Sequence, residues 1–266
     1  MSIAAFHRLH EAGCFLMPNA WDAGSAAMLQ HLGFSAIAST SSGHAWSLAR
    51  RDNEVGLGPV LAHLRSLVES VDVPVNADFE GGFAIDPGEV ASNVTLAVAT
   101  GVAGLSIEDS TGDARAPLFD FELAVERVAA ARAAIDASGS GVILTARSEG
   151  FIAGRPDLED TVRRLQAYAR AGADCLYAPG IRTADEIRAV VNSVAPRPVN
   201  VLVSADFTTV RALADAGVRR ISVGGALARV AWGAFMSAAV EMKEYGTFTR
   251  LASAAPSATI EEGFRS

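Results

Sequence analysis

Short apolar runs alternate with longer segments of helical periodicity along almost the whole chain. The apolar runs predict short buried strands, and the periodic segments between them predict amphipathic helices. The predicted strands are Phe15–Met17, Ala36–Ser39, Val75–Ala77, Leu105–Ile107, Ile143–Ala146, Cys175–Tyr177, Val199–Val203 and Ile221–Val223. The predicted helices are Ala23–His31, Pro59–Val71, Pro87–Thr100, Phe121–Ala137, Leu158–Ala171, Ala184–Ser193 and Phe207–Ala216.

Four of the junctions between helix and strand share one form. HLGFSAIA, ATGVAGLSI, RAGADCLYA and DAGVRRISV each run from a helix end through glycine and a small turn into an apolar strand. Strands that alternate with helices in this way predict parallel βαβ units. Eight such units favour an α/β fold of the (β/α)8 TIM-barrel type over an open doubly wound sheet. No GxGxxG or Walker loop follows a predicted strand, which weakens the nucleotide-binding alternative.

No linker-like stretch divides the chain, so residues 1–266 are predicted to form one barrel domain. After the last predicted strand, Ala226–Tyr245 is an alanine-rich helix, and a further segment ends in TIEEGFRS. This tail is longer than one barrel helix requires. Residues 226–266 are therefore predicted to be a C-terminal helical extension that packs on a partner subunit.

Composition and charge exclude several classes of function. The chain has 266 residues, a net charge of −8 and a pI near 5.1, which gives no electrostatic basis for binding nucleic acid or an anionic membrane. Cys14 and Cys175 lie in apolar runs and are predicted to be buried thiols. The N-terminus has no signal-peptide pattern, and no apolar run reaches membrane-spanning length. The expected localisation is cytoplasmic.

Polar residues collect at the predicted carboxyl ends of the strands, which is where barrels of this type place their active sites. They are Asn19, Trp21 and Asp22 after the first strand, Ser39–His44 after the second, Asn76, Asp78 and Glu80 at the third, Glu108 and Asp109 at the fourth, and Arg147 and Glu149 at the fifth. A barrel that needed only stability would have no reason to concentrate acids at one rim. The pattern predicts a catalytic or binding site there.

Asp78 and Glu108 lie one βα unit apart, so they are expected on neighbouring strand ends. Two carboxylates with room for water suit Mg²⁺, and Mn²⁺ is an alternative metal. Arg147, on the next strand, offers a planar fork suited to a substrate carboxylate. A structural interpretation stays open for each residue alone, because Asp78 is also a plausible turn or helix cap and Glu108–Arg147 a plausible ion pair. The joint arrangement on three consecutive strands favours a site for a small oxo-acid.

NADFEGGFA, GLSIEDS, TARSEGF and the loop STSSGHA…RRDNE resemble the isocitrate lyase/phosphoenolpyruvate mutase superfamily. The resemblance implies a barrel that binds Mg²⁺ and a 2-oxo acid or its enolate. It also implies a homotetramer, a dimer of dimers whose last barrel helix is exchanged between subunits. The implied metal ligands are Asp78 and Glu108, with Asp52 and Asn76 reaching the metal through water. The predicted substrate-binding residues are Ser41, Ser42, Gly43, Arg147 and Asn200, and the predicted catalytic residues are Asp52, Glu80 and Arg147.

This chain departs from that family's pattern at several points. Asn76 stands where the family's strand-three motif typically begins with aspartate. The segment SIEDSTGDARAPLFD lacks the cysteine and histidine of the gating loop that the carbon–carbon lyases carry. Glu80 is the leading candidate for the general acid/base because it lies on the loop nearest the predicted metal ligand. The other candidates are His44, Glu149 and Tyr177.

The sequence predicts a Mg²⁺-dependent lyase that cleaves the bond at C3 of a small 2-oxo or 2-hydroxy (di)carboxylic acid through an enolate. The first alternative is a phosphonomutase or a phosphonate hydrolase of the same superfamily. Arg115 is the only basic residue between Asp109 and Asp120, which gives a transferring phosphoryl group little charge support there. The second alternative is a non-catalytic binder of a 2-oxo acid.

Overall fold

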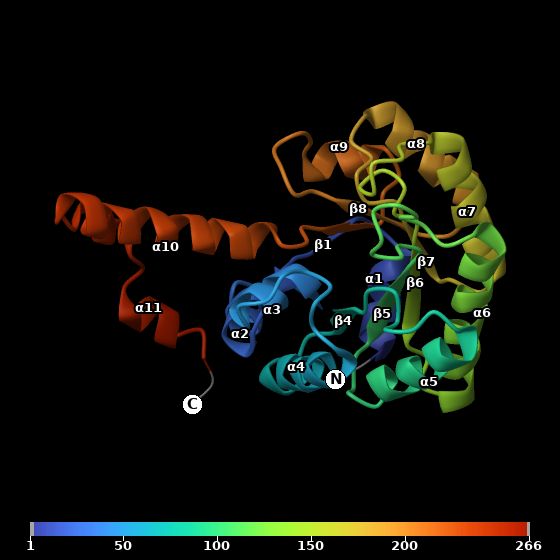
Figure 1. The fold of residues 1–266 in the computed structure, drawn as a ribbon, viewed down its shortest axis with the longest axis horizontal. Helices are drawn as coiled ribbons and strands as arrows, with labels where there is room; N and C mark the ends of the chain where they lie inside the picture. The colour runs from blue at the N-terminus through green and yellow to red at the C-terminus, as the bar shows by residue number, and fades with distance from the viewer. Residues whose placement is uncertain (1–2, 265–266) are drawn as a thin grey trace.

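The computed structural model describes residues 3–264, in which nine parallel strands form a nearly closed barrel surrounded by helices (Figure 1). The strands are β1 (Phe15–Met17), β2 (Asn19–Ala20), β3 (Ile37–Ser39), β4 (Val75–Asp78), β5 (Gly104–Glu108), β6 (Ile143–Arg147), β7 (Cys175–Tyr177), β8 (Val199–Leu202) and β9 (Arg220–Ser222). Their order is β1-β9-β8-β7-β6-β5-β4-β3-β2. The predicted TIM-type (β/α)8 fold is confirmed.

The barrel closes through its first strand, which is split into two pieces. β1 pairs with β9, and β2 pairs with β3. Pro18 separates them, because proline has no backbone N–H to donate to a strand ladder. Its carbonyl still accepts a bond from Ala38 N at 2.9 Å, so the strand bends there and keeps both neighbours. Eight predicted strands therefore become nine observed ones.

Each βα unit supplies one or more helices to the outside of the barrel (Figure 1). The helices are α1 (Ile3–Glu11), α2 (Ala23–His31), α3 (Ser41–Ser47), α4 (Leu57–Ser70), α5 (Pro87–Val98), α6 (Phe121–Ser138), α7 (Leu158–Arg170), α8 (Ala184–Val194), α9 (Val210–Asp215), α10 (Ala226–Tyr245) and α11 (Ser257–Glu261), with a 3₁₀ turn at Thr249–Ser253. Helix α2 begins at Ala23, as predicted, and Asp22 is its N-cap, whose side chain accepts a hydrogen bond from Ser25 N.

The sequence analysis described the segment after β3 as a loop, but the structure shows a helix there, α3. The Thr40 side chain accepts a hydrogen bond from Gly43 N and caps the helix, so a run of small polar residues becomes helical. His44 is consequently buried, and its ring stacks on that of His63 at 3.8 Å between centroids. The sequence analysis placed His44 in a loop, whereas the structure places it in a helix with its ring in the interior.

Helix α1, which was not predicted, closes the N-terminal end of the barrel. Phe6 is fully buried in a small cluster with Met17, Ala36, Ala38, Ala103 and Ile143, residues in or directly before β1, β3, β5 and β6. This end is therefore sealed by apolar packing. The opposite end, where the strands finish, is the one that stays open to ligands.

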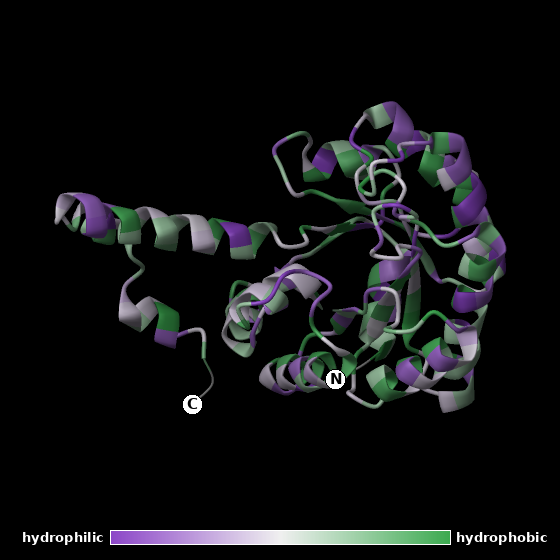
Figure 2. Cartoon of the chain, in the orientation of Figure 1, coloured by the Kyte–Doolittle hydropathy of each residue, from purple (hydrophilic) through white to green (hydrophobic). Residues whose placement is uncertain are grey.

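Helix α10 leaves the barrel as a projecting arm, followed by α11 (Figure 1). Only Ala228 and Glu241 of its residues are buried. Hydrophobic and hydrophilic residues alternate along the arm (Figure 2). No helix within residues 3–264 is long and apolar enough to cross a membrane. The last two residues of the predicted extension lie outside the described part of the chain.

Candidate active site

The Arg147 guanidinium binds three carboxylates at the carboxyl ends of β4, β5 and β6. Its Nη1 donates to Asp78 Oδ1 at 2.7 Å, and its Nη2 lies 3.1 Å from Glu108 Oε2. Its Nε donates to Glu149 Oε1 at 2.8 Å. The residues pair across neighbouring strands because Glu108 is in register with Arg147 in the parallel ladder. One cation therefore organises the acidic rim that the sequence predicted.

Asp78 is fixed by its neighbours on both sides of its carboxylate. Ser41 N donates to Asp78 Oδ2 at 2.9 Å, and Asp78 N donates to Ser39 Oγ at 2.7 Å. The start of α3 and the end of β3 thus hold Asp78 from one side, while Arg147 holds it from the other. The carboxylate is preorganised and is about 18% exposed, so it stays accessible to a ligand.

Negative charge exceeds positive charge at this rim. Burial raises the pKa of Glu108 and of Glu149, although Arg147 opposes the rise. Burial, with further contributions from Asp78 and Asp52, raises the pKa of Glu80 to about 8. Burial alone would lower the pKa of Arg147, but the surrounding carboxylates raise it well above its usual value. Carboxylates that compete for one arginine are the environment in which an added cation binds favourably.

The pocket beside this rim has a volume of about 220 Å³ and brings together most of the predicted site. Its lining includes the predicted residues Ser41, Ser42, Asp52, Asn76, Asp78, Arg147 and Asn200. Tyr177 also lines it, with its ring 5.2 Å below the Arg147 guanidinium. Such a volume lies under the roughly 300–1,000 Å³ of sites for drug-sized ligands, so it suits a small acid.

Gly43 lies outside this lining, and its role in the structure is close packing. A Cβ at position 43 would come 2.7 Å from Thr40 Cγ2 and 2.9 Å from Trp21 Cβ. The glycine lets α3 approach the segment after β2 and the base of α10. Its predicted contact with substrate stays a prediction.

Glu80 and Glu108 line a second cavity of about 500 Å³, on the other side of the acidic rim. The backbone of Glu80 is in the left-handed region, with φ of +49°, which is costly for a residue with a side chain. Glu108 N donates to Glu80 O at 3.0 Å and holds this turn against β5. The structure thus places Glu80 next to the rim but not in the lining of the smaller pocket.

A divalent cation fits the donor set of the rim. Within residues 3–264, no three His, Cys, Asp or Glu side chains form a preformed metal cage. Mg²⁺ does not require one, because it commonly binds through one or two carboxylates and keeps several waters. Asp78 and Glu108 provide hard oxygen donors on adjacent strands, and the excess of acids over Arg147 favours a cation.

Sequence reasoning missed Arg220, which lines the pocket from β9. The predicted strand began one residue later, at Ile221, so Arg220 was placed before the sheet. Its inward position follows from the alternation of a strand, which puts Arg220 and Ser222 on the same face. The signal available in the sequence was the spacing of Arg220 and Ser222, because residues two apart in a strand share one face.

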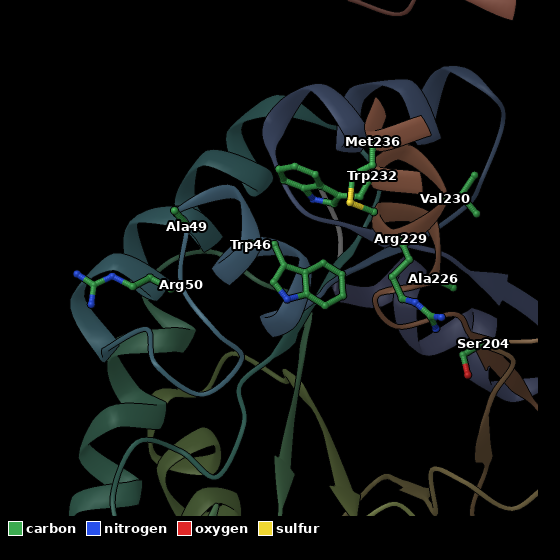
Figure 3. A pocket seen from close by; sticks show the side chains of 9 residues that line it. All are labelled: Trp46, Ala49, Arg50, Ser204, Ala226, Arg229, Val230, Trp232 and Met236. Carbon is green, nitrogen blue, oxygen red and sulfur yellow. The ribbon is translucent and has the colours of Figure 1, made fainter. Parts of the chain in front are cut away.

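A wider groove of about 760 Å³ opens outside the barrel, between the end of α3 and the start of α10 (Figure 3). Trp46, Trp232 and Met236 give it an apolar wall, and Arg229 and Arg50 supply its cations. Among residues 3–264, no carboxylate or histidine lines this groove. We therefore place the chemistry in the smaller pocket.

Comparison with known proteins gives a consistent assignment. The family model described as phosphoenolpyruvate phosphomutase matches residues 6–243. A crystal structure from Burkholderia cenocepacia J2315 is similar at 47% identity and a TM-score of 0.95, covering 97% of this chain and 94% of that one. The structure of 2,3-dimethylmalate lyase is similar at 25% identity and a TM-score of 0.87, covering 98% and 94%. Phosphonopyruvate hydrolase of Variovorax sp. (strain Pal2) is 28% identical, over 77% of this chain and 73% of its own length.

Proposed function

The chain belongs to the phosphoenolpyruvate phosphomutase family, within the isocitrate lyase/phosphoenolpyruvate mutase superfamily, and from this premise we propose that it is a lyase acting on a small 2-oxo or 2-hydroxy dicarboxylic acid. Its homologues are lyases and phosphonomutases. The observation that carries the proposal is the rim in which Arg147 binds Asp78, Glu108 and Glu149 beside a pocket of about 220 Å³.

Members of this superfamily are generally dependent on a divalent metal. In this chain Asp78 and Glu108 would hold Mg²⁺ or Mn²⁺, with Asp52 and Asn76 reaching it through water. When bound, the metal would offset the negative charge that develops on the 2-oxo oxygen and the adjacent carboxylate as the bond at C3 breaks. Arg147 keeps the two acids in place, because its guanidinium binds both of them.

The same geometry limits what Arg147 does to the substrate. Its Nε, Nη1 and Nη2 each already have a carboxylate partner, so it positions the rim more directly than it binds a free substrate carboxylate. The Ser41 and Ser42 hydroxyls and the Asn200 side chain line the same pocket and supply neutral hydrogen-bonding groups. Glu80 is the proposed general acid/base, acting from the adjoining side of the rim.

Charge distribution favours carbon–carbon over phosphorus–carbon chemistry. The side chain of Arg115 is 91% exposed and pairs with Asp113 at 2.8 Å, so it points into solvent. Arg50, Arg51 and Arg155 are not among the residues that line the pocket. A phosphoryl group carries more charge than a carboxylate and depends on several cations. Arg147 is already paired with three carboxylates, so Arg220 is the one cation of the pocket lining without an ion pair among the described residues, which suits the lower charge of a carboxylate.

The test is a substrate screen followed by NMR, in which 2-oxo and 2-hydroxy dicarboxylic acids are compared with phosphonopyruvate, each with Mg²⁺ and with EDTA. A lyase converts a dicarboxylate only when the metal is present. Release of phosphate from phosphonopyruvate, with no dicarboxylate converted, would favour the hydrolase alternative. Thermal stabilisation by the acids without any conversion would identify a binder.

A further inference from the structure

The inside of the barrel below the acidic rim is polar. Barrels of this type are usually filled by layers of bulky branched side chains. Here the pocket lining continues inward over Asn76, Ser106, Asn200, Arg220 and Ser222, all of them strand residues that are almost fully buried. Burying polar groups is costly unless they find partners, and of this set only Asn76 Oδ1 has none in the described chain.

Arg220 lies at the inner end of this pocket and is 1% exposed. Its Nε donates to Asn200 Oδ1 at 2.9 Å, and its Nη2 donates to Thr145 Oγ1 at 2.9 Å. Its Nη1 lies 3.3 Å from His10 Nε2. His10 Nδ1 donates to Phe6 O, so Nε2 is the acceptor for Arg220. All three of these partners are neutral.

The contrast with Arg147 is direct. Arg147 forms ion pairs with Asp78, Glu108 and Glu149, whereas Arg220 takes part in no ion pair within residues 3–264. Arg220 also keeps N–H groups that none of its three neutral partners uses, because a guanidinium has five. A buried cation without a counter-ion carries a large desolvation cost. A bound anion would remove that cost.

Distance along the strand separates the two arginines into two levels. Thr145, which binds Arg220, lies two residues before Arg147 on β6, which corresponds to roughly 7 Å along the strand. Asn76 Oδ1, also at the inner level and 4% exposed, has no hydrogen-bond partner in the described chain. The pocket thus has an acidic rim, which suits a metal, and a cationic floor.

We infer that the floor of the pocket is an anion subsite, in which Arg220 binds the distal carboxylate of a dicarboxylic acid whose other end lies at the acidic rim. Asn200 and Thr145 orient the guanidinium for this contact. The inference rests on the proposed function for the identity of the ligand as a substrate. It assigns the specificity for a second carboxylate to Arg220 and not to Arg147.

The test compares the binding of succinate and butyrate, which have the same chain length but two and one carboxylates, by calorimetry in buffer with Mg²⁺. The wild-type protein should bind succinate at least about tenfold more tightly than butyrate, since a hydrogen-bonded charge contributes this much to affinity. Arg220→Gln should remove the difference and leave butyrate binding within about twofold. Arg220→Lys should keep part of the preference for succinate, because lysine retains the positive charge but lacks the planar guanidinium.

Arg127→Gln is the matched control. Arg127 is also 1% exposed and has no carboxylate partner in the described chain, but its guanidinium binds the carbonyls of Gly81, Ala84 and Ile85 outside the pocket. This variant should lose stability and keep the preference for succinate. Equal wild-type affinities for the two acids, or an unchanged preference in a folded Arg220 variant, would overturn the inference.

If the Arg220 variants do not fold, a crystal structure of the wild-type protein with succinate decides the matter. A carboxylate within hydrogen-bond distance of the Arg220 guanidinium supports the subsite, and succinate bound elsewhere refutes it. Succinate bound at Arg220 in a protein that converts no dicarboxylate would retain the subsite and reject the lyase. Turnover of a dicarboxylate by a protein that does not prefer succinate over butyrate would reject the subsite and retain the lyase.

Discussion

Asp78 is the residue on which most of the rim depends. Its carboxylate accepts hydrogen bonds from Ser41 N and Arg147, and so links the start of α3 to the end of β6. The sequence predicted the meeting of Asp78, Glu108 and Arg147 correctly, because neighbouring parallel strands end at one edge. It did not predict that all three nitrogens of the Arg147 guanidinium would have carboxylate partners. The third partner is Glu149, which follows the same strand and turns back toward Arg147.

Asp78→Ala should lower the affinity for Mg²⁺ by more than about tenfold and abolish turnover, because it removes the proposed direct ligand. Metal binding is measured by calorimetry on the folded variant. Asp86→Ala is the control: Asp86 caps α5, and its loss should cost about 1 kcal/mol of stability without changing metal affinity. Retained metal binding and activity in Asp78→Ala would rule out the metal site.

Glu80→Gln should lower kcat by about 10²–10⁴ and leave Mg²⁺ affinity unchanged, because the amide cannot transfer a proton. Steady-state kinetics and calorimetry on the same preparation measure both quantities. Glu89→Gln, an exposed change in the first turn of α5, should alter neither. An unchanged kcat in Glu80→Gln would remove Glu80 as the general acid/base.

At the scale of elements, strands were easier to predict than the helices that shape the site. Each predicted strand matches an observed one within one residue at either end, because short apolar runs between glycine turns have few alternatives. Helix α3 was missed because its sequence, SSGHAWS, lacks an apolar period and begins at a Thr40 cap that periodicity does not detect. Helix α1 was missed because its packing under the barrel is a tertiary feature.

Helices α3 and α4 bring His44 and His63 together in the interior, with a consequence for stability. Burial, with a smaller contribution from His44, lowers the pKa of His63 to about 3. Between pH 6.5 and about 3 the unfolded chain binds a proton at this position and the folded chain does not. The free energy of unfolding should therefore fall as the pH falls, by up to about 1.4 kcal/mol per pH unit from this group.

Denaturant titrations between pH 7 and pH 5 measure this slope. His63→Gln should flatten it relative to the wild-type protein. The wild-type protein and the variant are compared under the same conditions. An equally steep slope in the absence of His63 would contradict the assignment.

At the scale of the whole molecule, α10 exposes a large apolar surface for a helix of 20 residues. The exposed side chains are Val230, Trp232, Phe235, Met236, Val240 and Met242. The helix projects from the barrel (Figure 1), and part of it forms the apolar wall of the outer groove (Figure 3). Apolar patches of this kind are rare on monomers, so we propose that a second copy of the chain covers the arm, in a tetramer.

Phe235→Glu should shift the protein to smaller assemblies in size-exclusion chromatography with light scattering, because a charge would be buried in the proposed interface. Leu96→Glu, at an exposed apolar position on α5 that is 45% accessible, should leave the assembly unchanged. A wild-type protein that is monomeric at micromolar concentration would contradict the proposed tetramer.

The most direct test of the central claim is the exchange of the C3 protons of pyruvate in deuterated buffer, followed by proton NMR. This reaction needs only the metal, the acidic rim and a proton-transferring group. The account predicts loss of the C3 signal in the presence of protein and Mg²⁺, and no loss with EDTA or with Asp78→Ala. Exchange no faster than in buffer with Mg²⁺ alone would contradict a rim that promotes chemistry at C3.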